Sequence, residues 1–387
     1  MSISSLDQPN VLPLSSVKVV EFCEVASGPF CGMLLADMGA EVIKVEREKV
    51  GDSMRAWPPL SNGFSENFAS VNRNKMSIAL DLKRAEDRVI ARRLALAGDV
   101  VIENYRPGVM GKNGLGYAEL SQEKPSLIYC SISAFGQSGP RAQEGGFDLT
   151  IQAASGLMSV TGEPNGAPVK CGVPVADFSA GLYAAFCVAA SLRKVSVSGK
   201  GEHIDVSMLG ATLSIAALQT SEYFGTGQDP KQLGSAHPRN APYQAFQAKN
   251  GYFAMAAGND RLWRSVCEVV KRLDLVLDER FVDTARRAKN QAELKIILEG
   301  KFAERNTEEW IEAFTNAGVP ASPINQYSDI LKDAQVTHMG WVREIVLPSG
   351  VSTKTFISPV LLSGKNIELR SLPPTLDQHR GKILASI

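Results

Sequence analysis

The first third of the chain alternates short β-branched runs with longer segments of helical spacing. The strand-like runs are VKVVEF (17–22), EVIKVE (41–46), DVVIENY (99–105) and SLIYCSIS (126–133). The helix-like segments are PFCGMLLADMGA (29–40) and RAEDRVIARRLALAG (84–98), each of which stops at a glycine. Strands that alternate with helices predict βαβ units, so we expect an α/β fold with a Rossmann-like parallel sheet.

The middle of the chain has a different pattern. Residues 179–194 are apolar nearly all round, which predicts a helix buried in the core. A turn and a strand are expected in SVSGKGEHIDVSML (196–209), followed by a second helix over roughly 206–224. The loop at 225–242 contains several glycines and prolines, and it is the best candidate for a domain boundary.

The region beyond this loop predicts a smaller α+β domain. The sequence Lys249-Asn250-Gly251 has the chemistry of a hairpin turn. Two charge-rich segments of helical character follow, at 261–275 and 290–317. The tail at 341–387 has short strands and prolines without a strong period.

Composition narrows the classes of partner. Lys+Arg and Asp+Glu both number 41, so the formal net charge is zero and gives no reason to expect nucleic acid or an anionic membrane as partner. We see no apolar run near the roughly 20 residues that span a bilayer. The lead-in at 1–16 lacks an apolar core and arginine, so we expect no signal or transit peptide.

Six cysteines lie at positions 23, 31, 130, 171, 187 and 267, without a C-x-x-C pair. Most of them fall in apolar segments, which predicts free thiols and a cytoplasmic location. The four histidines (203, 237, 338 and 379) are far apart and show no metal-ligand spacing, so no metal site is expected.

Several catalytic motifs are missing from the sequence. The stretch GPFCGM after the first strand has the wrong spacing for the G-x-G-x-x-G turn that a nicotinamide-dependent oxidoreductase needs. The chain also lacks a Walker phosphate loop and the G-x-S-x-G elbow of serine hydrolases.

Three polar clusters remain as candidates for chemistry. SVNRNKMSIALDLK (70–83) concentrates cations around a strand, and ENYRPG (103–108) directly follows a strand, where parallel sheets bind ligands. The alternative is that these cations are solvated loop residues. The third cluster is GVPVADFSAG (172–181), in which Asp177 separates an apolar run from the apolar helix. From the residues alone, Asp177 is a candidate helix N-cap.

Together with other motifs, these clusters resemble the class III CoA-transferase family, which includes formyl-CoA, carnitine and dicarboxylate CoA-transferases and related acyl-CoA racemases. The matching motifs occur in the family's order and cover essentially the whole chain. They are GPFCGMLLADMGAEVIKVE (28–46), NRNKMSIALDLK (72–83), ENYRPG (103–108), GFDLTIQAASGLMSVTG (146–162), VADFSAG (175–181), GKGEHIDVSM (199–208) and VPASPIN (319–325).

The resemblance implies an interlocked homodimer and a discontinuous large domain. We accordingly expect a large CoA-binding α/β domain at 1–200 and a linker helix at 201–225. A small α+β domain at 226–325 would follow, and the tail at 326–387 would return to the large domain.

The resemblance also implies that Asp177 is a covalent nucleophile that attacks a thioester, with CoA as a substrate and no cofactor. A helix N-terminus would hold such a carboxylate ionised, so the N-cap and nucleophile roles are compatible. The positions that match CoA contacts of the family are Val25, Ala26, Arg47, Arg73, Lys75, Leu80, Lys83, Asn104, Tyr105, Arg106, Lys112, Ser133, Phe135 and Gly136.

This chain departs from the family pattern at two of these positions. Some transferases carry glutamine where this chain has Ala26, and some carry lysine where it has Ser133. Backbone amides are a reasonable substitute for stabilising the oxyanion.

The racemases of the family use a histidine base at the position of Phe147, whose side chain cannot move a proton, which favours CoA transfer. The loop GSAHPRNAPYQAF (234–246) is similar to the dicarboxylate subgroup, which predicts succinyl-CoA as donor and a C4–C6 dicarboxylate such as glutarate, itaconate or mesaconate as acceptor. His237 and Arg239 could face the distal carboxylate, or His237 could only order the loop. The alternatives are a racemase and a non-catalytic CoA-binding protein.

Overall fold

The computed structural model describes residues 11–387, which form two compact units. The first unit comprises the described part of Met1–Leu157 together with Lys170–Gly227 and Ala334–Ile387, and the second comprises Met158–Val169 and Gln228–Asp333. Of the stretch on which the absence of a targeting signal was predicted, residues 1–10 lie outside the described part.

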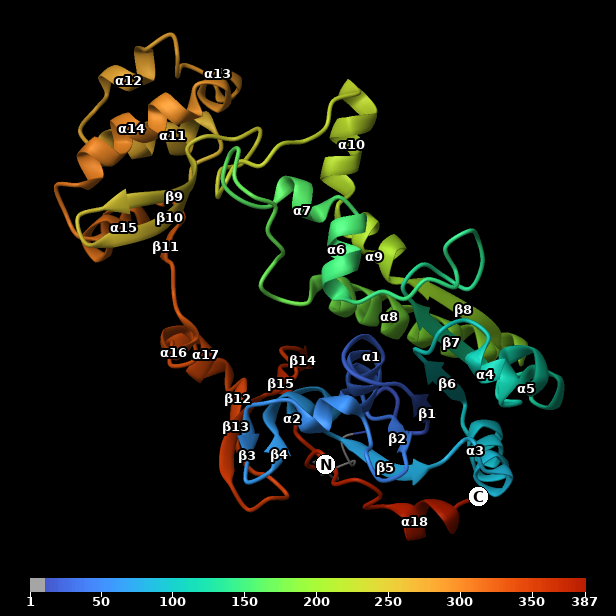
Figure 1. Ribbon diagram of the computed structural model, residues 1–387. Coiled ribbons are helices and arrows are strands. Elements are labelled where there is room, and N and C mark those ends of the chain that lie inside the picture. Colours follow the sequence, from blue (N-terminus) through green and yellow to red (C-terminus); the bar gives the residue numbers. More distant parts are fainter. Residues whose placement is uncertain (1–10) are drawn as a thin grey trace, which may run out of the picture. The chain divides into compact units, whose positions relative to one another are not determined.

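The first unit is built on a parallel sheet of six strands in the order β5-β2-β1-β6-β7-β8 (Figure 1). The bounds of the strands are β1 (Lys18–Phe22), β2 (Glu41–Arg47), β5 (Lys75–Leu80), β6 (Val100–Glu103), β7 (Ile128–Ser133) and β8 (Glu202–Ser207). The strand order reverses between β1 and β6, because the chain first builds outward from β1 and then returns to its other side. The predicted α/β fold with a parallel sheet is confirmed.

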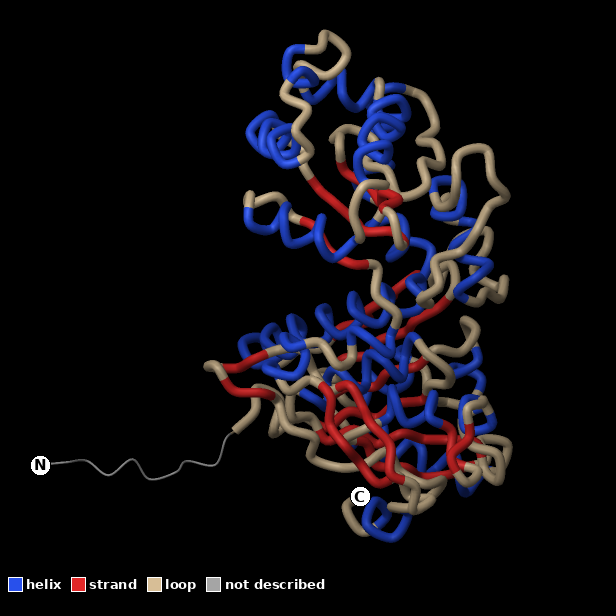
Figure 2. Tube along the Cα trace, turned by 90° about the vertical axis from the view of Figure 1, so that its left-hand side faces the viewer, coloured by secondary structure: helices blue, strands red, loops and turns tan. Residues whose placement is uncertain are grey.

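Helices cover both faces of this sheet, as its apolar strands require (Figure 1, Figure 2). One face packs against α1 (Ser27–Asp37) and α8 (Val175–Ser198), and the other packs against α3 (Ala85–Ala97) and α5 (Tyr117–Glu123). Alternate residues of β1 serve the two cores, since Val19 belongs to the first and Val20 to the second. Every residue of β6 and β7 is buried.

Helix α8 corrects two predictions. We expected a core helix at 179–194, but only one face of α8, with Ala180 and Ala184, is buried, whereas Phe186 is 71% exposed. We also expected no apolar run that could span a bilayer, yet α8 is long and apolar enough by length and composition. Its alanine face packs closely against α1, where a side chain on Gly181 would collide with the backbone of Ser27.

The region expected as a linker helix at 201–225 has another structure. It begins with β8, which extends the main sheet in register with β7, and continues with α9 (Met208–Ile215) and α10 (Ala217–Thr226). Ser207 caps α9 through a hydrogen bond from the N–H of Gly210. This part of the chain therefore belongs to the sheet of the first unit.

The C-terminal tail covers the edge strand β5. Asp377 Oδ1 accepts a hydrogen bond from the N–H of Ala79 at 2.8 Å, and the His379 N–H donates to the carbonyl of Ser77 at 3.1 Å. These contacts occupy the polar backbone groups that an edge strand leaves unpaired. Helix α18 (Arg380–Leu384) follows and places Ile383 in the core.

The second unit contains a three-stranded antiparallel sheet with helices on one face. The strands are β9 (Tyr243–Ala248), β10 (Gly251–Ala256) and β11 (Ala321–Pro323), so the predicted hairpin at 249–251 is confirmed. Its helices are α11 (Asp260–Val269), α12 (Asp274–Leu277), α13 (Thr284–Lys289), α14 (Gln291–Phe302) and α15 (Thr307–Asn316). Their core is aromatic, with Phe253 and Phe302 rings 5.1 Å apart.

Short elements complete the chain. The remaining strands are β3 (Leu60–Ser61), β4 (Phe64–Ser65), β12 (Val342–Val346), β13 (Ser352–Phe356), β14 (Leu361–Leu362) and β15 (Lys365–Asn366). The remaining helices are η1 (Ser53–Ala56), α2 (Glu66–Asn72), α4 (Val109–Lys112), α6 (Asp148–Ala154), α7 (Leu157–Val160), α16 (Tyr327–Ile330) and α17 (Ala334–Met339).

A cluster of buried charges lies inside the first unit, on β1, β2 and β5. Glu21 receives Lys44 Nζ at 2.9 Å on one oxygen and Lys75 Nζ at 2.8 Å on the other, and all three side chains are fully buried. Lys75 also donates to the Pro29 carbonyl and to Asn72 Oδ1. Such a cluster is costly to assemble, and it is more costly to break, because the remaining charges cannot reach water.

We expect Lys75→Met to destabilise the first unit by roughly 3–5 kcal/mol, because Glu21 would keep a buried oxygen without its cation. The urea dependence of labelling at the Cys31 thiol, which is fully buried in this unit, measures the change locally.

The matched control is Lys354→Met, because Lys354 is largely exposed and lies 4.0 Å from Glu344. This variant should change the free energy of unfolding by less than about 0.5 kcal/mol. Equal effects of the two substitutions would contradict a structural role of the buried cluster.

Candidate active site

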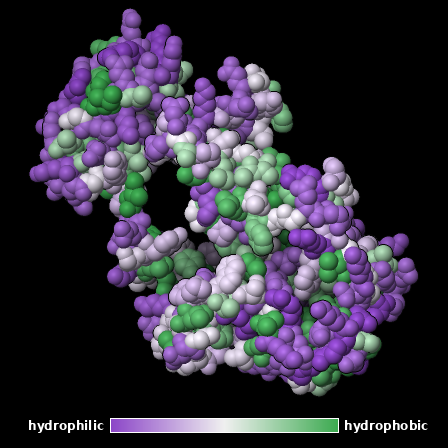
Figure 3. All heavy atoms as spheres, in the orientation of Figure 1, coloured by the Kyte–Doolittle hydropathy of each residue, from purple (hydrophilic) through white to green (hydrophobic). Residues whose placement is uncertain are grey.

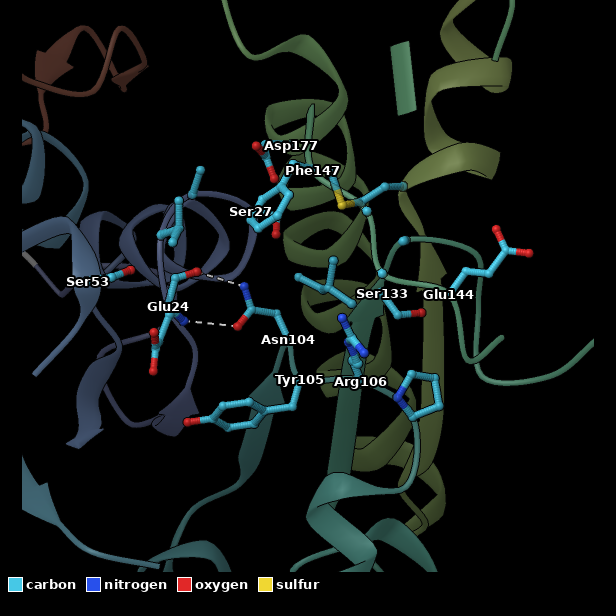
Figure 4. Close-up of a pocket in the computed structure, with 18 residues that line it drawn as sticks. Glu24, Ser27, Ser53, Asn104, Tyr105, Arg106, Ser133, Glu144, Phe147 and Asp177 are labelled. Carbon is cyan, nitrogen blue, oxygen red and sulfur yellow. Dashed lines mark hydrogen bonds between the residues drawn. The ribbon is translucent and has the colours of Figure 1, made fainter. Parts of the chain in front are cut away.

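A pocket of about 400 Å³ opens at the carboxyl ends of the central strands of the first unit (Figure 4). It lies at the point where the strand order reverses, which is where open α/β sheets bind ligands. We call it the Asp177 pocket. It is lined by Glu24, Val25, Ala26, Ser27, Ser53, Asn104, Tyr105, Arg106, Pro107, Ile132, Ser133, Ala134, Glu144, Gly145, Gly146, Phe147, Asp177 and Met208.

The turn after β1 forms one wall, and side chains from elsewhere hold it in a strained conformation. Val25 has a φ of 66°, which a β-branched residue rarely adopts. Its N–H donates to both carboxylate oxygens of Asp52, at 3.0 and 3.2 Å. The side chain of Asn104 holds Glu24, the residue before Val25, through two hydrogen bonds. Its Oδ1 accepts from the Glu24 N–H at 2.9 Å, and its Nδ2 donates to the Glu24 carbonyl at 2.8 Å (Figure 4).

Asp52 connects this turn to the buried charge cluster. Its carboxylate lies 3.0 Å from Lys44 Nζ, which also donates to the Cys23 carbonyl at 2.7 Å. Burial would raise the pKa of Asp52, but Lys44 and the N–H groups of Met54 and Val25 bring it below its usual value. Asp52 therefore stays ionised and keeps the turn in place.

Asp177 lies in the first turn of α8, but it is not the helix N-cap that its sequence suggested. The N-cap residue is Pro174. The side chain that satisfies the start of α8 is Asp148, whose Oδ1 accepts a hydrogen bond from the Ala176 N–H at 2.9 Å. Asp177 is thereby free to face the pocket beside Ser27 (Figure 4).

The environment of Asp177 raises its pKa to about 6. Burial is the main cause, the negative charge of Asp148 adds to it, and a hydrogen bond with Ser27 opposes both. We expected the helix terminus to hold this carboxylate ionised, which would lower its pKa, but the pKa is raised. At neutral pH most of the carboxylate is still ionised, but it is poorly stabilised.

The loop between β7 and α6 provides the opposite wall. Phe147 is 76% exposed and lines the pocket, and its N–H is held by Thr150 Oγ at 3.0 Å. Side chains at Gly145 and Gly146 would collide with Arg106 and Ala134, respectively. The two glycines therefore let this loop approach the end of β7 and the segment after β6.

A second pocket, of about 450 Å³, opens at the ends of β2 and β5 in the same unit. We call it the Lys83 pocket. Tyr105 lines both pockets, so its ring marks where they adjoin. The Lys83 pocket is lined by Phe22, Val45, Glu46, Arg47, Glu48, Lys49, Val50, Leu80, Asp81, Leu82, Lys83, Tyr105, Val109 and Asn113.

The two pockets divide most of the residues predicted to contact CoA. The Asp177 pocket contains Val25, Ala26, Asn104, Tyr105, Arg106 and Ser133. The Lys83 pocket contains Arg47, Leu80, Lys83 and again Tyr105. Lys112, Phe135 and Gly136 line neither pocket. Phe135 instead lies under the guanidinium of Arg141, 3.8 Å from its ring centre.

Arg73 and Lys75 correct the predicted CoA set. Arg73 forms a buried ion pair with Asp37 at 2.6 Å, and Lys75 is fully enclosed by Glu21 and its neighbours. Neither cation lines the Asp177 pocket or the Lys83 pocket, because both neutralise carboxylates inside the unit. The cationic pattern around β5 that suggested a CoA contact therefore belongs to ion pairs inside the unit.

His237 and Arg239 belong to the second unit, which contains its own pocket lined in part by Tyr243. His237 Nδ1 accepts hydrogen bonds from the N–H groups of Arg239 at 3.1 Å and Asn240 at 3.0 Å. Its ring stacks on Tyr243, and burial together with Arg239 lowers its pKa. His237 therefore orders its loop, which is one of the two roles that the sequence left open.

Sequence reasoning missed four residues of the site region. Asp52 and Asp148 position the two walls, and Lys49 lines the Lys83 pocket. Asp148 had a signal, since it is the last residue of the GFD match. The fourth is Glu103, at the end of β6.

The side chain of Glu103 anchors the segment that follows β6. Its carboxylate accepts the N–H of Tyr105 at 2.9 Å, and Ser131, its in-register neighbour, contacts His203 Nε2 at 2.9 Å. Burial and Asp205 raise the pKa of Glu103 to about 7, against the hydrogen bonds from Ser131 and Tyr105. Within residues 11–387, no group of three or more His, Cys, Asp or Glu side chains could hold a metal ion.

Comparison with known proteins identifies the family. The profile of CoA-transferase family III matches residues 14–380. The chain belongs to CoA-transferase family III. A succinate–glutarate CoA-transferase of Agrobacterium fabrum is 36% identical over 389 residues, which cover 98% of this chain and 97% of that protein. A succinyl-CoA:glutarate CoA-transferase of Homo sapiens is 38% identical over 382 residues, which cover 98% of this chain and 87% of that protein.

A solved structure agrees with this assignment. The crystal structure of a CAIB/BAIF family protein from Brucella suis has a TM-score of 0.85 and 37% identity, and the match covers 97% of this chain and 99% of that one. The protein is thus a family III CoA-transferase, as the ordered motifs predicted, and its Asp177 pocket lies where the sheet topology favours a ligand.

The raised pKa of Asp177 predicts an acid limb in the pH profile of this transferase. If Asp177 reacts as a carboxylate, kcat/KM should fall as the pH drops through about 6. Asp148→Asn removes the second cause of the shift and keeps an oxygen for the Ala176 N–H, so the limb should move to lower pH. Asp99→Asn, at the opposite end of the sheet, is the control and should leave it unchanged. An acid limb that Asp148→Asn does not move would contradict this account.

Proposed function

We propose that this CoA-transferase moves CoA from succinyl-CoA to a C4–C6 dicarboxylate, such as glutarate, itaconate or mesaconate, with Asp177 as the covalent nucleophile. The single observation that supports the mechanism is the placement of Asp177, a partly buried carboxylate with no cation beside it and a raised pKa, in a pocket at the switch point of the sheet. The names of the two relatives support the choice of substrates.

The chemistry proceeds by exchange of acyl bonds, without a cofactor. The Asp177 carboxylate attacks the thioester carbonyl of the donor. The C–S bond breaks, CoA leaves as a thiolate, and a mixed acyl-aspartyl anhydride is formed. The thiolate then attacks the aspartyl carbonyl and releases the donor acid as a carboxylate, which leaves aspartyl-CoA. The acceptor carboxylate repeats both steps in reverse order and regenerates the Asp177 carboxylate.

Two features of the pocket suit these steps. An unstabilised carboxylate is a better nucleophile than one paired with a cation, and the pKa of about 6 leaves most of it ionised at neutral pH. In addition, no histidine lines the pocket, and Phe147 stands where the racemases carry their base. The lining therefore favours transfer over racemisation.

CoA would extend across both pockets of the first unit. Its nucleotide would lie in the Lys83 pocket, where Lys49 and Lys83 are exposed cations, and its pantetheine arm would pass Tyr105 towards Asp177. The predicted contacts at Arg47, Leu80, Asn104 and Ser133 fit this path. Arg73 and Lys75 do not fit it, because both side chains are engaged in buried ion pairs.

We propose a homodimer in which a second copy of the chain covers the apolar face of α8 to α10. Apolar side chains on this face include Leu182, Phe186, Leu218 and Phe224, the last of which is 81% exposed. In Figure 3, pale green spheres gather over the region of α9, whereas the surface over α10 mixes purple, white and green. Such a face is unusual for a monomer, and its chemistry matches itself across a two-fold axis. The interlocked form and a cytoplasmic location stay predictions.

The nucleophile can be tested by trapping. With succinyl-CoA and hydroxylamine, we expect mass spectrometry to find a hydroxamate on the peptide that contains Asp177. Asp177→Ala and the isosteric Asp177→Asn should each lower kcat by at least about 10³-fold without loss of folding, because the covalent route needs this carboxylate. Wild-type turnover by Asp177→Ala would refute the mechanism, and turnover of monocarboxylate acceptors only would refute the choice of substrates.

The homodimer can be tested by charge on the apolar face. Phe186→Glu combined with Phe224→Glu should convert a dimer into a monomer in sedimentation velocity, because two buried carboxylates per subunit would oppose association. The matched control is Leu277→Glu on the second unit, which is 83% exposed and should leave the dimer intact. A wild-type chain that sediments as a monomer at micromolar concentration would contradict the proposal.

A further inference from the structure

The charged side chains that line the Asp177 pocket differ in whether they have partners. They are Glu24, Arg106, Glu144 and Asp177. Glu24 forms an ion pair with Arg47 at 2.8 Å, and Glu144 forms one with Arg141 at 2.8 Å. Neither Arg47 nor Arg141 is among the residues that line this pocket. The charges of Glu24 and Glu144 are therefore compensated by cations outside the pocket lining.

Arg106 is the lining cation of this pocket, and within residues 11–387 no ion pair or side-chain hydrogen bond engages its guanidinium. The guanidinium lies against the backbone of Gly145, where an added Cβ would come within 2.9 Å of Nη2. Arg106 belongs to the segment after β6, which Asn104 and Glu103 anchor through hydrogen bonds. Figure 4 shows it between Tyr105 and Ser133, directed into the pocket.

The lining of the pocket that contains Arg106 and Asp177 also has an apolar part. It includes Ile132, Ala134, Phe147 and Met208. A ligand that fits this lining has an acyl carbon for Asp177 at one end, methylene groups in the middle and a carboxylate for a guanidinium at the other end.

We propose that Arg106 binds the distal carboxylate of the acyl group and so selects dicarboxylic over monocarboxylic substrates. This inference rests on the proposed transfer of CoA between dicarboxylates. It replaces the CoA contact that the sequence predicted for Arg106. Because donor and acceptor acids occupy the same place in successive half-reactions, one guanidinium serves both of them.

A CoA phosphate is the competing anion for Arg106. Exposed cations suited to phosphates, Lys49 and Lys83, lie instead in the Lys83 pocket, beyond Tyr105. Arginine also offers two parallel N–H donors, a geometry that matches a carboxylate in a bidentate pair. The separation of the two pockets thus assigns phosphates to one and the acyl carboxylate to the other.

The test uses two ligands that differ only at the distal end, glutaryl-CoA and valeryl-CoA, in which a methyl group replaces the carboxylate. Dissociation constants are measured by calorimetry in the non-reacting Asp177→Ala background, with and without Arg106→Gln. We expect Arg106→Gln to weaken glutaryl-CoA at least tenfold and to change valeryl-CoA less than threefold. Arg106→Lys keeps the positive charge but loses the two parallel N–H donors of the guanidinium. Its dissociation constant for glutaryl-CoA should lie between those of the Arg106 and the Arg106→Gln proteins.

Two further variants separate the sources of an effect. Gly145→Ala should displace the guanidinium and reduce the preference for glutaryl-CoA in the same direction, and the φ of Gly145 does not forbid alanine. Lys83→Gln makes the same charge change in the Lys83 pocket, and it should weaken both ligands equally. Steady-state kcat/KM values for glutarate and valerate with native Asp177 should follow the same ratios.

Equal weakening of both CoA esters by Arg106→Gln would overturn the inference and return Arg106 to the CoA contacts, with the nucleophile role of Asp177 untouched. A protein that binds the two esters equally well before any change at Arg106 would overturn both the inference and the dicarboxylate substrates. Loss of hydroxylamine trapping at Asp177 would instead overturn only the mechanism.

Discussion

The fully buried ion pairs of Glu21 with Lys44 and Lys75 are the interaction on which the rest of the first unit depends. They join three neighbouring strands, β1, β2 and β5, and Lys44 extends the cluster to Asp52 and to the turn after β1. That turn contains Val25 in a left-handed conformation, which persists only where its surroundings over-determine it. The charges therefore stabilise the fold and set the shape of the ligand site at the same time.

The position of Asp177 follows from this frame and from α8. Because Asp148 satisfies the amide of Ala176, Asp177 does not have to cap its own helix, and its carboxylate faces the pocket. Burial next to a second carboxylate costs stability, which is visible in the raised pKa. Carboxylates that destabilise the fold in this way are typical of functional sites, and in the described part of the chain Asp177 forms no ion pair that would offset the cost. Arg106 lines the same pocket and carries a charge of the opposite sign, which is the basis of the proposal that the ligand combines a reactive carbonyl with an anion.

The strands and the fold class could be predicted because local pattern carries that information. Strand-like runs of six to eight residues that alternate with segments of helical spacing leave few alternatives to a parallel sheet. The apolar face of α8 could not be assigned, since an apolar helix reads the same whether it meets a core or a second chain. Arg73 and Lys75 were misjudged for a related reason: a cation beside a strand gives no sign of whether a carboxylate from another strand will neutralise it.

The sequence by itself determined the family, the parallel α/β core and Asp177 as the candidate nucleophile, because ordered motifs and strand periodicity are properties of neighbouring residues. Only the tertiary structure decided which charges are compensated. Arg47 and Arg141 form ion pairs with Glu24 and Glu144, whereas Arg106 and Asp177 line one pocket and neither forms an ion pair within residues 11–387. Such compensation depends on contacts between residues that are far apart along the chain, and Coulombic interaction at 3 Å follows distance in space rather than distance in sequence.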